Sequence, residues 1–558
     1  MLEGFDPTTI QDIEGARQAI VQLLNLIETL ATDNRELRAE NQRLRDELNR
    51  LKGEPGQPKI KPNRPAPAAT DHSSERERRK PRPRKKRRKV EQLVVPAEQV
   101  LKVDPARLPE DAEFKGHEDV VVQDIEIKLN NILFHKEKYY SAREQRTYLA
   151  ELPAGYGGEY GPGVKALTIV LYHAANLSEP KVSEFFKYVG IRISDGQISN
   201  LLVKGHDKFH AEKEAVYAAG LSSSPWPHID ETGTRVNGEN HHCHIVCNPL
   251  YTAYITTEKK DRLAVLQALL NGRALTFRLN SEAYVWLAPV GLPASALTGL
   301  QALPQDQALS EAEFTRCLAE QLPTLGAQHR RRIMEAAAVA AYQTQQEFPV
   351  VELLLCDDAD QFKRLTAELA GCWVHDGRHY KKLVPVVPRH REKLADFLGD
   401  YWNFYDDLLA YQQAPTPEGA AQRVREFDEL TARVTGYAAL DDRIAKTRAK
   451  KDALLLVLKH PELPLHNNPA ELAARQRVRK RDVSFGPRTQ AGKQTWDTFT
   501  PAPPQVRVTL AATTKKLGVS FYKYVFDRVA GNNHVPKLAD LITEQAKQLR
   551  LGESWQAT

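Results

Sequence analysis

One short stretch, residues 227–235, constrains the fold of this chain more than any other. In an extended strand, His228, Asp230 and Thr232 point to the same face, because side chains alternate with a period of two. The stretch therefore predicts a strand that holds one carboxylate in a fixed place. Such a carboxylate can bind a metal ion if other acids of the chain approach it.

Two later stretches predict further acids for the same site. Residues 350–358 contain an apolar run that ends at Asp357, as a buried strand does where it reaches the surface. Residues 467–479 predict a helix with one acid, Glu471, among several arginines. Together with Asp230, these acids would offer the hard oxygen ligands that suit Mg²⁺ or Mn²⁺, and a pair of such ions can hold the attacking and leaving oxygens of a phosphodiester.

The length and composition predict a multidomain protein of the cytoplasm. A chain of 558 residues exceeds the usual size of one domain. Its formal net charge of +6 is modest, but lysine and arginine are concentrated in two segments. Five cysteines in so long a chain are typical of a reduced intracellular protein. We find neither a long apolar run nor a signal-peptide pattern, and we expect no membrane partner.

The N-terminal segment, residues 8–52, repeats apolar residues every seven positions. This spacing predicts a leucine-zipper coiled coil, because β-branched residues at one core position and leucine at the other favour two parallel strands. Asn34 and Asn41 would fix the register by pairing across the seam. A single amphipathic helix packed on its own domain is the alternative. The residues expected at the dimer seam are Ile20, Leu23, Ile27, Leu30, Asn34, Leu37, Asn41, Leu44, Leu48 and Leu51.

Residues 53–110 predict a flexible basic linker, since prolines and small polar residues precede a dense run of positive charge. Such an arm gains affinity for DNA by releasing counterions from the phosphates. A solvated linker and a nuclear localisation signal have the same composition. The side chains expected to contact DNA are Arg82, Arg84, Lys85, Lys86, Arg87, Arg88 and Lys89.

Residues 111–215 predict a DNA-binding region. Its first part, 111–152, has a β-rich pattern with an alternating strand at 120–127. Helical patterns follow at 164–175, 179–189 and 195–208, a spacing that suits a helix-turn-helix. Ordinary bundle helices would give a similar pattern. In the third helix, which Ser194 can cap, Gln197, Ser199 and Asn200 are the candidates for DNA contact.

Residues 216–500 predict an α/β core in which the three acids lie on separate elements. Strands are expected at 241–247 and 251–256, so Asp230 would lie on the first strand of an antiparallel meander. A helix at 361–370 and a short strand at 372–375 are expected after Asp357. Helical insertions of about 281–348 and 392–458 and a helical tail at 501–558 complete the interpretation. Strands with helices on their faces and acids at the strand ends indicate a ribonuclease-H-like mixed sheet.

Several motifs, in this order along the chain, resemble the transposases of insertion-sequence 66 elements. The motifs are the N-terminal zipper, residues 160–163 at the start of a helical region, 228–232, 371–375, 467–471 ahead of an arginine-rich helix, and 516–521 in the tail. The resemblance covers most of the chain. Each match is modest alone, whereas all of them in register are specific.

The resemblance implies a DDE transposase with a ribonuclease-H-like core, in which Asp230, Asp357 and Glu471 are the catalytic metal ligands. Asp358 is the main rival of Asp357, and Glu231 is a weaker candidate because it points away from the face of Asp230. Two Mg²⁺ or Mn²⁺ ions would support cleavage at the transposon ends and transfer of the freed 3′-hydroxyl into target DNA. The expected partners are DNA and a second copy of the chain, in a homodimer or a higher oligomer.

The helix after Glu471 carries a series of basic residues that could hold DNA phosphates near the metal ions. A solvated cationic helix face is the alternative. These residues are Arg475, Arg477, Arg479, Lys480 and Arg481. Trp373 is expected to pack in the core.

No zinc is expected, although the family usually carries a cysteine-based zinc module between the zipper and the helix-turn-helix. The chain has no cysteine before Cys243. In a strand, the cysteines and histidines of residues 241–247 alternate between faces, which scatters the possible ligands. Two other functions stay open: a nuclease of the same fold that cleaves without joining, and a catalytically inactive or domesticated DNA-binding relative.

Overall fold

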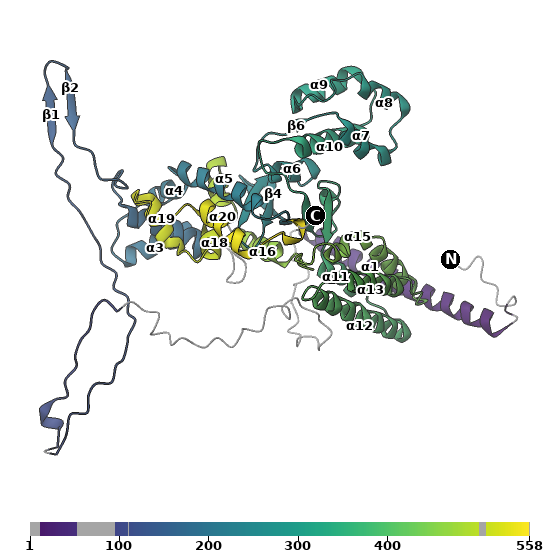
Figure 1. Cartoon of the computed structure of the whole chain (residues 1–558), viewed down its shortest axis with the longest axis horizontal. Coiled ribbons are helices and arrows are strands. Elements are labelled where there is room, and N and C mark those ends of the chain that lie inside the picture. Colours follow the sequence, from purple (N-terminus) through teal and green to yellow (C-terminus); the bar gives the residue numbers. More distant parts are fainter. Residues whose placement is uncertain (1–9, 11, 53–94, 110, 501–508, 557–558) are drawn as a thin grey trace.

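The structure, a computed structural model, describes residues 10, 12–52, 95–109, 111–500 and 509–556 (Figure 1). The basic arm at 82–89 therefore lies outside the described residues. Within the described part of the chain, no helix combines the length and apolar character needed to cross a membrane.

A five-stranded mixed sheet forms the centre of the molecule. Strands β3 (His228–Val236), β4 (Glu239–Cys247) and β5 (Thr252–Thr257) form an antiparallel meander. Strands β8 (Leu353–Cys356) and β9 (Glu368–Gly371) extend the sheet in parallel, which gives the order β5-β4-β3-β8-β9. The predicted α/β class and the predicted meander are confirmed.

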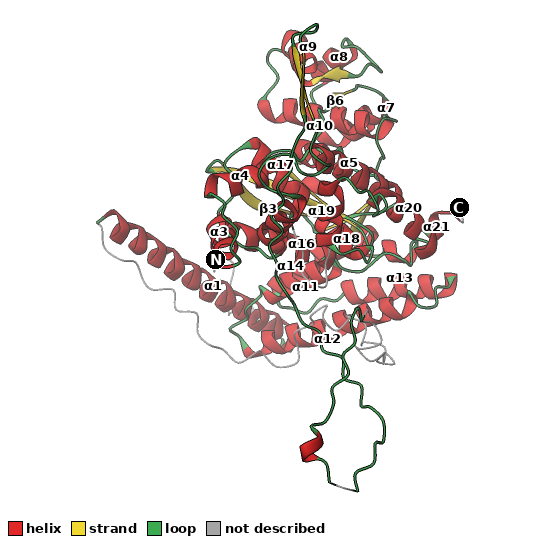
Figure 2. Ribbon diagram, turned by 90° about the vertical axis from the view of Figure 1, so that its left-hand side faces the viewer, coloured by secondary structure: helices red, strands yellow, loops and turns green. Residues whose placement is uncertain are grey.

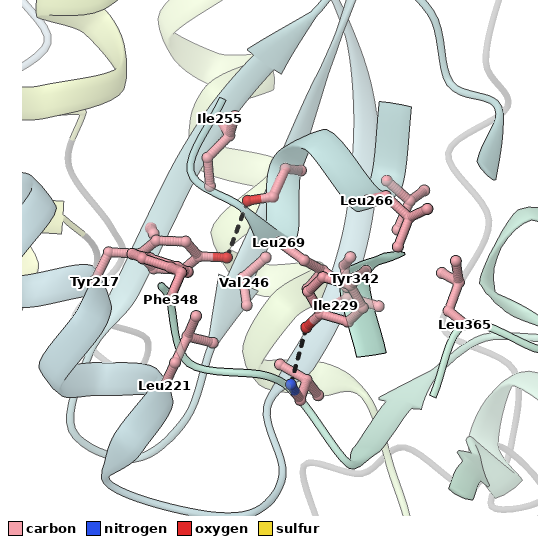
Figure 3. Packing of buried hydrophobic residues seen from close by; sticks show 14 of the residues in the cluster. Tyr217, Leu221, Ile229, Val246, Ile255, Leu266, Leu269, Tyr342, Phe348 and Leu365 are labelled. Atoms are coloured by element: carbon pink, nitrogen blue, oxygen red, sulfur yellow. Dashed lines mark hydrogen bonds between the residues drawn. The ribbon is translucent and has the colours of Figure 1, made fainter. Parts of the chain in front are cut away.

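One face of the sheet carries the main hydrophobic core. Helices α5 (Asp207–Ser222), α6 (Arg262–Leu269) and α10 (Ala327–Thr344) pack there. Figure 3 shows apolar side chains of these helices against the strands, among them Tyr217, Leu266, Ile229 and Val246. The Tyr217 hydroxyl donates to the carbonyl of Ala268 at 3.0 Å, so its polar atom is satisfied inside the core. Each such large buried side chain stabilises the fold by roughly 1.5–3 kcal/mol.

Helix α16 (Asn468–Ser484) packs against the sheet through small residues. Ala473 and Ala474 form a buried cluster with Cys243, Ile245 and Tyr254 of the strands. The Tyr254 hydroxyl donates to the Ala473 carbonyl at 2.8 Å. Because alanine lets a helix approach a sheet closely, this face holds α16, and with it Glu471, near β3. Helix α17 (Gln490–Phe499) follows and packs on β5.

Two helical insertions form separate lobes on opposite sides of the sheet (Figures 1 and 2). The first contains β6 (Thr276–Phe277), α7 (Ser281–Leu287), η6 (Ala288–Val290), α8 (Ala294–Gln301), β7 (Leu309–Ser310), α9 (Glu311–Gln321) and α10. The second contains α11 (Trp373–Lys381), α12 (Pro388–Tyr411), α13 (Pro417–Thr431), α14 (Ala438–Arg448), α15 (Lys451–Leu454) and η8 (Leu456–Leu458). The second lobe has its own core, in which Trp373 is fully buried, as expected.

The stretch after β8 differs from the sequence-based expectation. Only a short 3₁₀ turn, η7 (Asp360–Phe362), replaces the helix expected at 361–370, and the strand lies at Glu368–Gly371 instead of 372–375. The residues expected in the strand instead lie at the start of helix α11. Cys372 caps this helix, because its Sγ accepts a hydrogen bond from the His375 amide at 3.3 Å. Burial of Trp373 among aromatic residues of α12 and α13 fixes this conformation, which local alternation alone could not indicate.

The N-terminal helix α1 (Ile13–Leu51) lies along the second lobe. Its side chains at the expected zipper seam are largely exposed, with Leu30 at 53% and Leu37 at 63%. The opposite face is bound to its own chain: the Val386 and Val387 amides donate to the Glu28 carboxylate at 2.7 and 3.0 Å. The helix therefore has one attached face and one free face.

The region before the core is only partly as expected. The strand expected at 120–127 is wrong: those residues are extended but pair with nothing described, and a hairpin of β1 (Lys138–Ser141) and β2 (Arg146–Leu149) follows. A short 3₁₀ turn, η4 (Pro105–Arg107), precedes it. Alternating residues favour an extended backbone, but a strand also needs a neighbour to accept its hydrogen bonds.

The predicted helices of this region are present, with shifted ends. They are α2 (Pro162–Ile169), which continues into a π-helix, η5 (Val170–Ala174), then α3 (Glu179–Tyr188) and α4 (Asp195–Val203). Ser194 caps α4 by accepting from the Gln197 amide at 3.2 Å, as its position predicted. The C-terminal part is helical, with α18 (Thr509–Lys516), α19 (Phe521–Ala530), α20 (Leu538–Leu549) and α21 (Glu553–Gln556).

Candidate active site

The register of the sheet places Asp230 beside Asp357. Strands β3 and β8 are parallel, and His228 pairs with Leu355. Asp230 and Asp357 each follow their paired residue by two positions, so they reach the same level along neighbouring strands. Because side chains alternate between the two faces of a strand, Asp230 and Asp357 point to the same face of the sheet as His228 and Leu355.

A buried asparagine ties Glu471 to the same sheet edge. The Asn467 side chain donates to the carbonyl of Ile229 at 2.6 Å, and its amide oxygen lies 3.0 Å from Nδ1 of His228. Its backbone amide donates to Sγ of Cys372 at 3.2 Å. Asn467 directly precedes α16, and Glu471 lies in the first turn of that helix. Asn467, directly before α16, thus joins β3 through its side chain and the start of α11 through its backbone amide.

The three acids line one cavity. Its volume is about 250 Å³, and its walls are formed by Asp230, Asp357, Glu471, His375, Arg378, Asn467 and Arg475. The fold thus brings together acids that lie more than one hundred residues apart in the sequence. Two arginines face three carboxylates, which makes the cavity a site of mixed charge.

Arg378 binds Glu471 with both arms of its guanidinium. Nη1 donates to Oε1 at 2.8 Å and Nη2 donates to Oε2 at 2.9 Å. The paired geometry is the strongest that an arginine and a carboxylate can form. Glu471 is mostly buried and Arg378 is about half exposed, with 17% and 42% of their side chains accessible.

The environment of Asp230 disfavours its charged form. Burial is the largest cause, and the negative charges of Asp357 and Glu471 add to it, so the pKa of Asp230 rises to about 7. The amide of Glu231, which donates to Oδ1 at 2.8 Å, opposes the rise but does not cancel it. Crowded carboxylates of this kind are relieved either by a proton or by a cation.

The acids are not gathered tightly enough to form a metal cage as they stand. Among the described residues, no group of three or more histidine, cysteine, aspartate or glutamate side chains has the spacing of a metal site. Both oxygens of Glu471 point to Arg378 instead.

Comparison with known proteins identifies the stretch that carries most of this cavity. Residues 327–495 match the model of the family described as "Transposase IS66 family". This stretch of the chain is similar to the transposases of the IS66 family. The matched stretch runs from α10 to α17 and includes Asp357, Arg378 and Glu471, whereas Asp230 precedes it. This match supports a role in transposition, and hence an enzyme that acts on DNA.

A protein of Sinorhizobium fredii is also similar to this chain. It bears the name "Uncharacterized protein y4jO" and is 29% identical over 329 residues, which make up 59% of this chain and 99% of the relative. The similarity therefore extends well beyond the stretch that the family model matches.

The two rival acids, Asp358 and Glu231, have other partners. Asp358 lies 2.5 Å from Nζ of Lys450 and 3.5 Å from Nζ of Lys363. Glu231 lies 4.0 Å from Nζ of Lys260. Neither residue lines the cavity that Asp230, Asp357 and Glu471 share. The geometry therefore favours Asp357 over Asp358.

Two of the basic residues expected to contact DNA are internal, so the prediction is wrong for them. Arg477 is fully buried and donates to Asp497 and Thr256, both at 2.9 Å. Lys480 is 1% exposed and donates to the Tyr172 carbonyl at 2.5 Å, and its burial lowers its pKa to about 7. Both residues join α16 to neighbouring elements.

The other basic residues of α16 have different positions. Arg475 lines the acid cavity, and Arg479 is exposed. Arg481 is partly buried and donates to the carbonyl of Gly233 on β3. Arg475 and Arg479 thus remain available to a ligand outside the fold.

The candidate DNA-reading residues lie on α4. Asn200 is exposed, and Gln197 and Ser199 are partly exposed. Buried Ile198 and Leu202 hold the opposite face of α4 against its neighbours. Asn200 therefore points away from the packed face, whereas Ser199 hydrogen-bonds Glu179 of α3.

The sequence did not single out Arg378 or Asn467 as site residues, whereas His375 was a candidate to position a nucleophile beside a carboxylate. Arg378 and His375 lie in a stretch that was expected to be strand and loop. Asn467 belongs to a motif quoted for its resemblance, but its bond to β3 spans a sequence separation of 238 residues. An asparagine directly before a predicted helix is the one local signal, and it indicates a cap rather than a tie between elements.

Proposed function

We propose that this protein is a DDE-type DNA transposase whose catalytic residues are Asp230, Asp357 and Glu471. In this proposal it cleaves the ends of a transposon and joins the freed 3′-hydroxyl to target DNA. The observation that carries the proposal is the convergence of these acids, from three separate elements, on one cavity of about 250 Å³.

The order of the strands supports a ribonuclease-H-like core. An antiparallel meander, β3 to β5, is followed by two strands parallel to its first strand. Asp230 lies on β3, Asp357 directly follows the neighbouring strand β8, and Glu471 lies on α16, which packs against the sheet. This arrangement places them at one edge of a rigid scaffold.

The donor set fits divalent ions of the hard type. Carboxylate oxygens are the ligands that Mg²⁺ and Mn²⁺ prefer. Burial and the neighbouring acids raise the pKa of Asp230, so a bound cation would stabilise its charged form. Asp230, Asp357 and Glu471 would hold the ions. When bound, such ions lower the pKa of a water molecule and stabilise the attacking and leaving oxygens of a phosphodiester.

The remaining residues of the cavity have roles that follow from their chemistry. Arg475 is exposed at the wall of the cavity and can bind a phosphate oxygen of the DNA strand. Arg378 holds Glu471 in a single orientation through two hydrogen bonds. Asn467 keeps α16 at a fixed distance from β3. These residues position the acids and the DNA for an in-line reaction.

Nicking of a DNA duplex that carries a candidate transposon end tests the proposal. We expect Mg²⁺-dependent nicking by the wild type and a loss of at least about 100-fold for Asp230→Asn, Asp357→Asn and Glu471→Gln, as for removal of a group that acts on the transition state. Asp358→Asn is the matched control and should keep most of the activity. Equal activity in all variants would exclude the proposed site.

A strand-transfer assay separates joining from cleavage. The wild type is supplied with a pre-cut end that carries a free 3′-hydroxyl and with a supercoiled target. Joined products support a transposase, whereas nicking without joined products would indicate a nuclease of the same fold. Binding of the end without nicking or joining would indicate a catalytically inactive relative.

A further inference from the structure

A second polar region lies beside the acid cavity and belongs to none of the motifs considered so far. It consists of two hollows, of about 760 and 440 Å³, that share Arg262, Gln328, Arg332 and Asp360. Their walls come from the loop after β5, from the first turns of α10 in the first insertion, and from the loop after β8. We call the two hollows together the basic trough.

Positive charge dominates the trough. The larger hollow is lined by Lys259, Lys260, Arg262, Arg331 and Arg332. Its acids are Glu258, Asp261 and Asp360. Asp261 caps α6 by accepting from the Ala264 amide at 3.1 Å, and Asp360 pairs with Lys363 at 2.8 Å. Two of the three acids are thus already engaged, and the basic side chains are left in excess.

A buried glutamate fixes the arginines of the trough. Glu335 is fully buried and binds Arg262, Arg331 at 3.0 Å and Arg332 at 2.9 Å. Arg262 is itself buried, and its Nε donates to the Lys363 carbonyl at 3.0 Å. Arg331 and Arg332 keep 60% and 40% of their side chains exposed. One negative charge therefore holds three positive ones in place, and two of them face solvent.

The trough adjoins the residues that directly follow the two strand acids of the cavity. On one wall Lys260 lies 4.0 Å from Glu231, the residue after Asp230. On the other, Lys363 lies 3.5 Å from Asp358, the residue after Asp357. A polyanion that extends from the acid cavity past Glu231 and Asp358 would therefore reach the trough. The first turn of α10 also lines both hollows, and the start of a helix favours negative charge.

We propose that the basic trough binds the phosphate backbone of the DNA that flanks the cleaved bond. This inference rests on the proposed function, because it takes the acid cavity as the position of the scissile phosphate. Fixed guanidinium groups suit phosphate oxygens, and they bind DNA without reading its bases. The first insertion then serves as one wall of the DNA-binding surface.

The salt dependence of DNA binding tests this proposal without any cleavage. The affinity of the full-length protein for a duplex is measured in EDTA at several salt concentrations, by fluorescence anisotropy. For B-DNA, the slope of log K against log salt changes by about 0.9 for each phosphate contact. We expect Lys259→Gln/Lys260→Gln and Arg331→Gln/Arg332→Gln each to reduce the slope by about 1 to 2.

A charge-matched control is available in the same chain. Arg316 on α9 and Arg425 on α13 are exposed and lie outside both hollows. Arg316→Gln/Arg425→Gln removes the same charge and should leave the slope within error of the wild type. The lysine pair decides the result if loss of Arg331 and Arg332 around buried Glu335 prevents folding, because Lys260 forms only a long ion pair, 4.0 Å from Glu231.

Two outcomes would overturn the proposal: an unchanged slope in the lysine pair, or an equal decrease in the control pair. Neither outcome bears on the catalytic acids, because no metal is present. Conversely, a trough that binds phosphates in a protein that never nicks DNA would leave the phosphate-binding role of the trough standing and exclude the proposed reaction. The two proposals therefore fail separately.

Discussion

At the scale of single residues, the acid cavity behaves as a site with too much negative charge around one carboxyl group. Asp230 has a pKa of about 7 because it is buried beside Asp357 and Glu471. The same carboxyl in an unfolded chain titrates near 4. Folding therefore favours the protonated form of Asp230 at mildly acidic pH, and this preference has a measurable effect on stability.

The sign of that effect follows from proton linkage. Between about pH 4 and pH 7 the folded state retains a proton that the unfolded state has lost, so Asp230 makes the protein less stable as the pH rises. Asp230→Asn removes this dependence. We expect the variant to gain stability relative to the wild type as the pH rises from 4 to 7, by roughly 4 kcal/mol in total, because each pH unit between the two pKa values contributes about 1.4 kcal/mol. Chemical denaturation in EDTA at pH 4.5, 6 and 8 measures it.

Asp358→Asn provides a control of opposite sign. Lys450 and Lys363 outweigh the effect of burial and lower the pKa of Asp358. Asp358 therefore stabilises the folded state above its unfolded pKa, and this contribution disappears as the pH falls. The variant should lose stability near pH 7 and lose less at low pH. A flat difference between the wild type and Asp230→Asn across this range would contradict the crowding of the three acids.

Arg378 leads to a second prediction about a single residue. Its guanidinium occupies both oxygens of Glu471, so it competes with any cation for that carboxylate. We expect Arg378→Ala to tighten Mn²⁺ binding at pH 7.5 by roughly fivefold to tenfold, about 1 kcal/mol, in a calorimetric titration. Arg448→Ala, at an exposed position of α14, should leave the affinity unchanged. Weaker binding would mean that the orientation Arg378 gives Glu471 helps the metal more than the competition hinders it.

At the scale of elements, the site depends on one asparagine that joins three of them. Loss of the Asn467 side chain would leave the Ile229 carbonyl and the His228 ring without this partner in a buried place. An unpaired buried polar group costs about 1–3 kcal/mol. We expect Asn467→Ala to lower the free energy of unfolding by this amount in urea denaturation.

The neighbouring asparagine is the matched control for this variant. Asn468 begins α16 and is only partly buried. Asn468→Ala should therefore change the free energy of unfolding by less than about 0.5 kcal/mol, as most substitutions outside special sites do. Equal losses in the two variants would show that the tie between α16 and β3 is unimportant for stability.

Elements that are defined by local periodicity could be predicted from the sequence. The strands β3 to β5 alternate clearly and are joined by short turns, so the meander and the position of Asp230 followed from the residues alone. Helix α11 could not be predicted in this way. Its start is determined by the Cys372 cap and by Trp373 packing among residues far along the chain.

Burial of charge was the other feature hidden in the sequence. Helix α16 carries basic residues all around its surface, and nothing local distinguishes Arg477 and Lys480 from Arg475 and Arg479. Only the packed structure shows that Arg477 donates a hydrogen bond to Asp497 and that Lys480 donates one to the Tyr172 carbonyl. Similarly, Arg378 and Glu471 are 93 residues apart, and no spacing rule relates them.

At the scale of the whole molecule, α1 connects the body of the protein to its expected partner. The helix is attached through positions that lie opposite the heptad seam: Asn25 donates to the Gly436 carbonyl at 3.1 Å, and Glu28 accepts from Val386 and Val387. The seam itself is exposed. A coiled coil with a second copy of the chain can therefore form without detaching α1 from the second lobe, which also carries Arg378.

Two variants should separate these faces of α1. Leu30→Glu/Leu37→Glu places charge at two core positions of the coiled coil, so we expect a monomer by light scattering while the Val386 and Val387 amides keep their protection from hydrogen exchange. Glu28→Ala should do the reverse, because those two amides lose their acceptor but the seam is untouched. Glu36→Gln, at an exposed position of the same helix, controls for loss of charge.

A seam variant that stays dimeric would exclude the coiled coil as the dimer contact. Loss of amide protection on monomerisation would show instead that α1 attaches to the body only as part of a dimer.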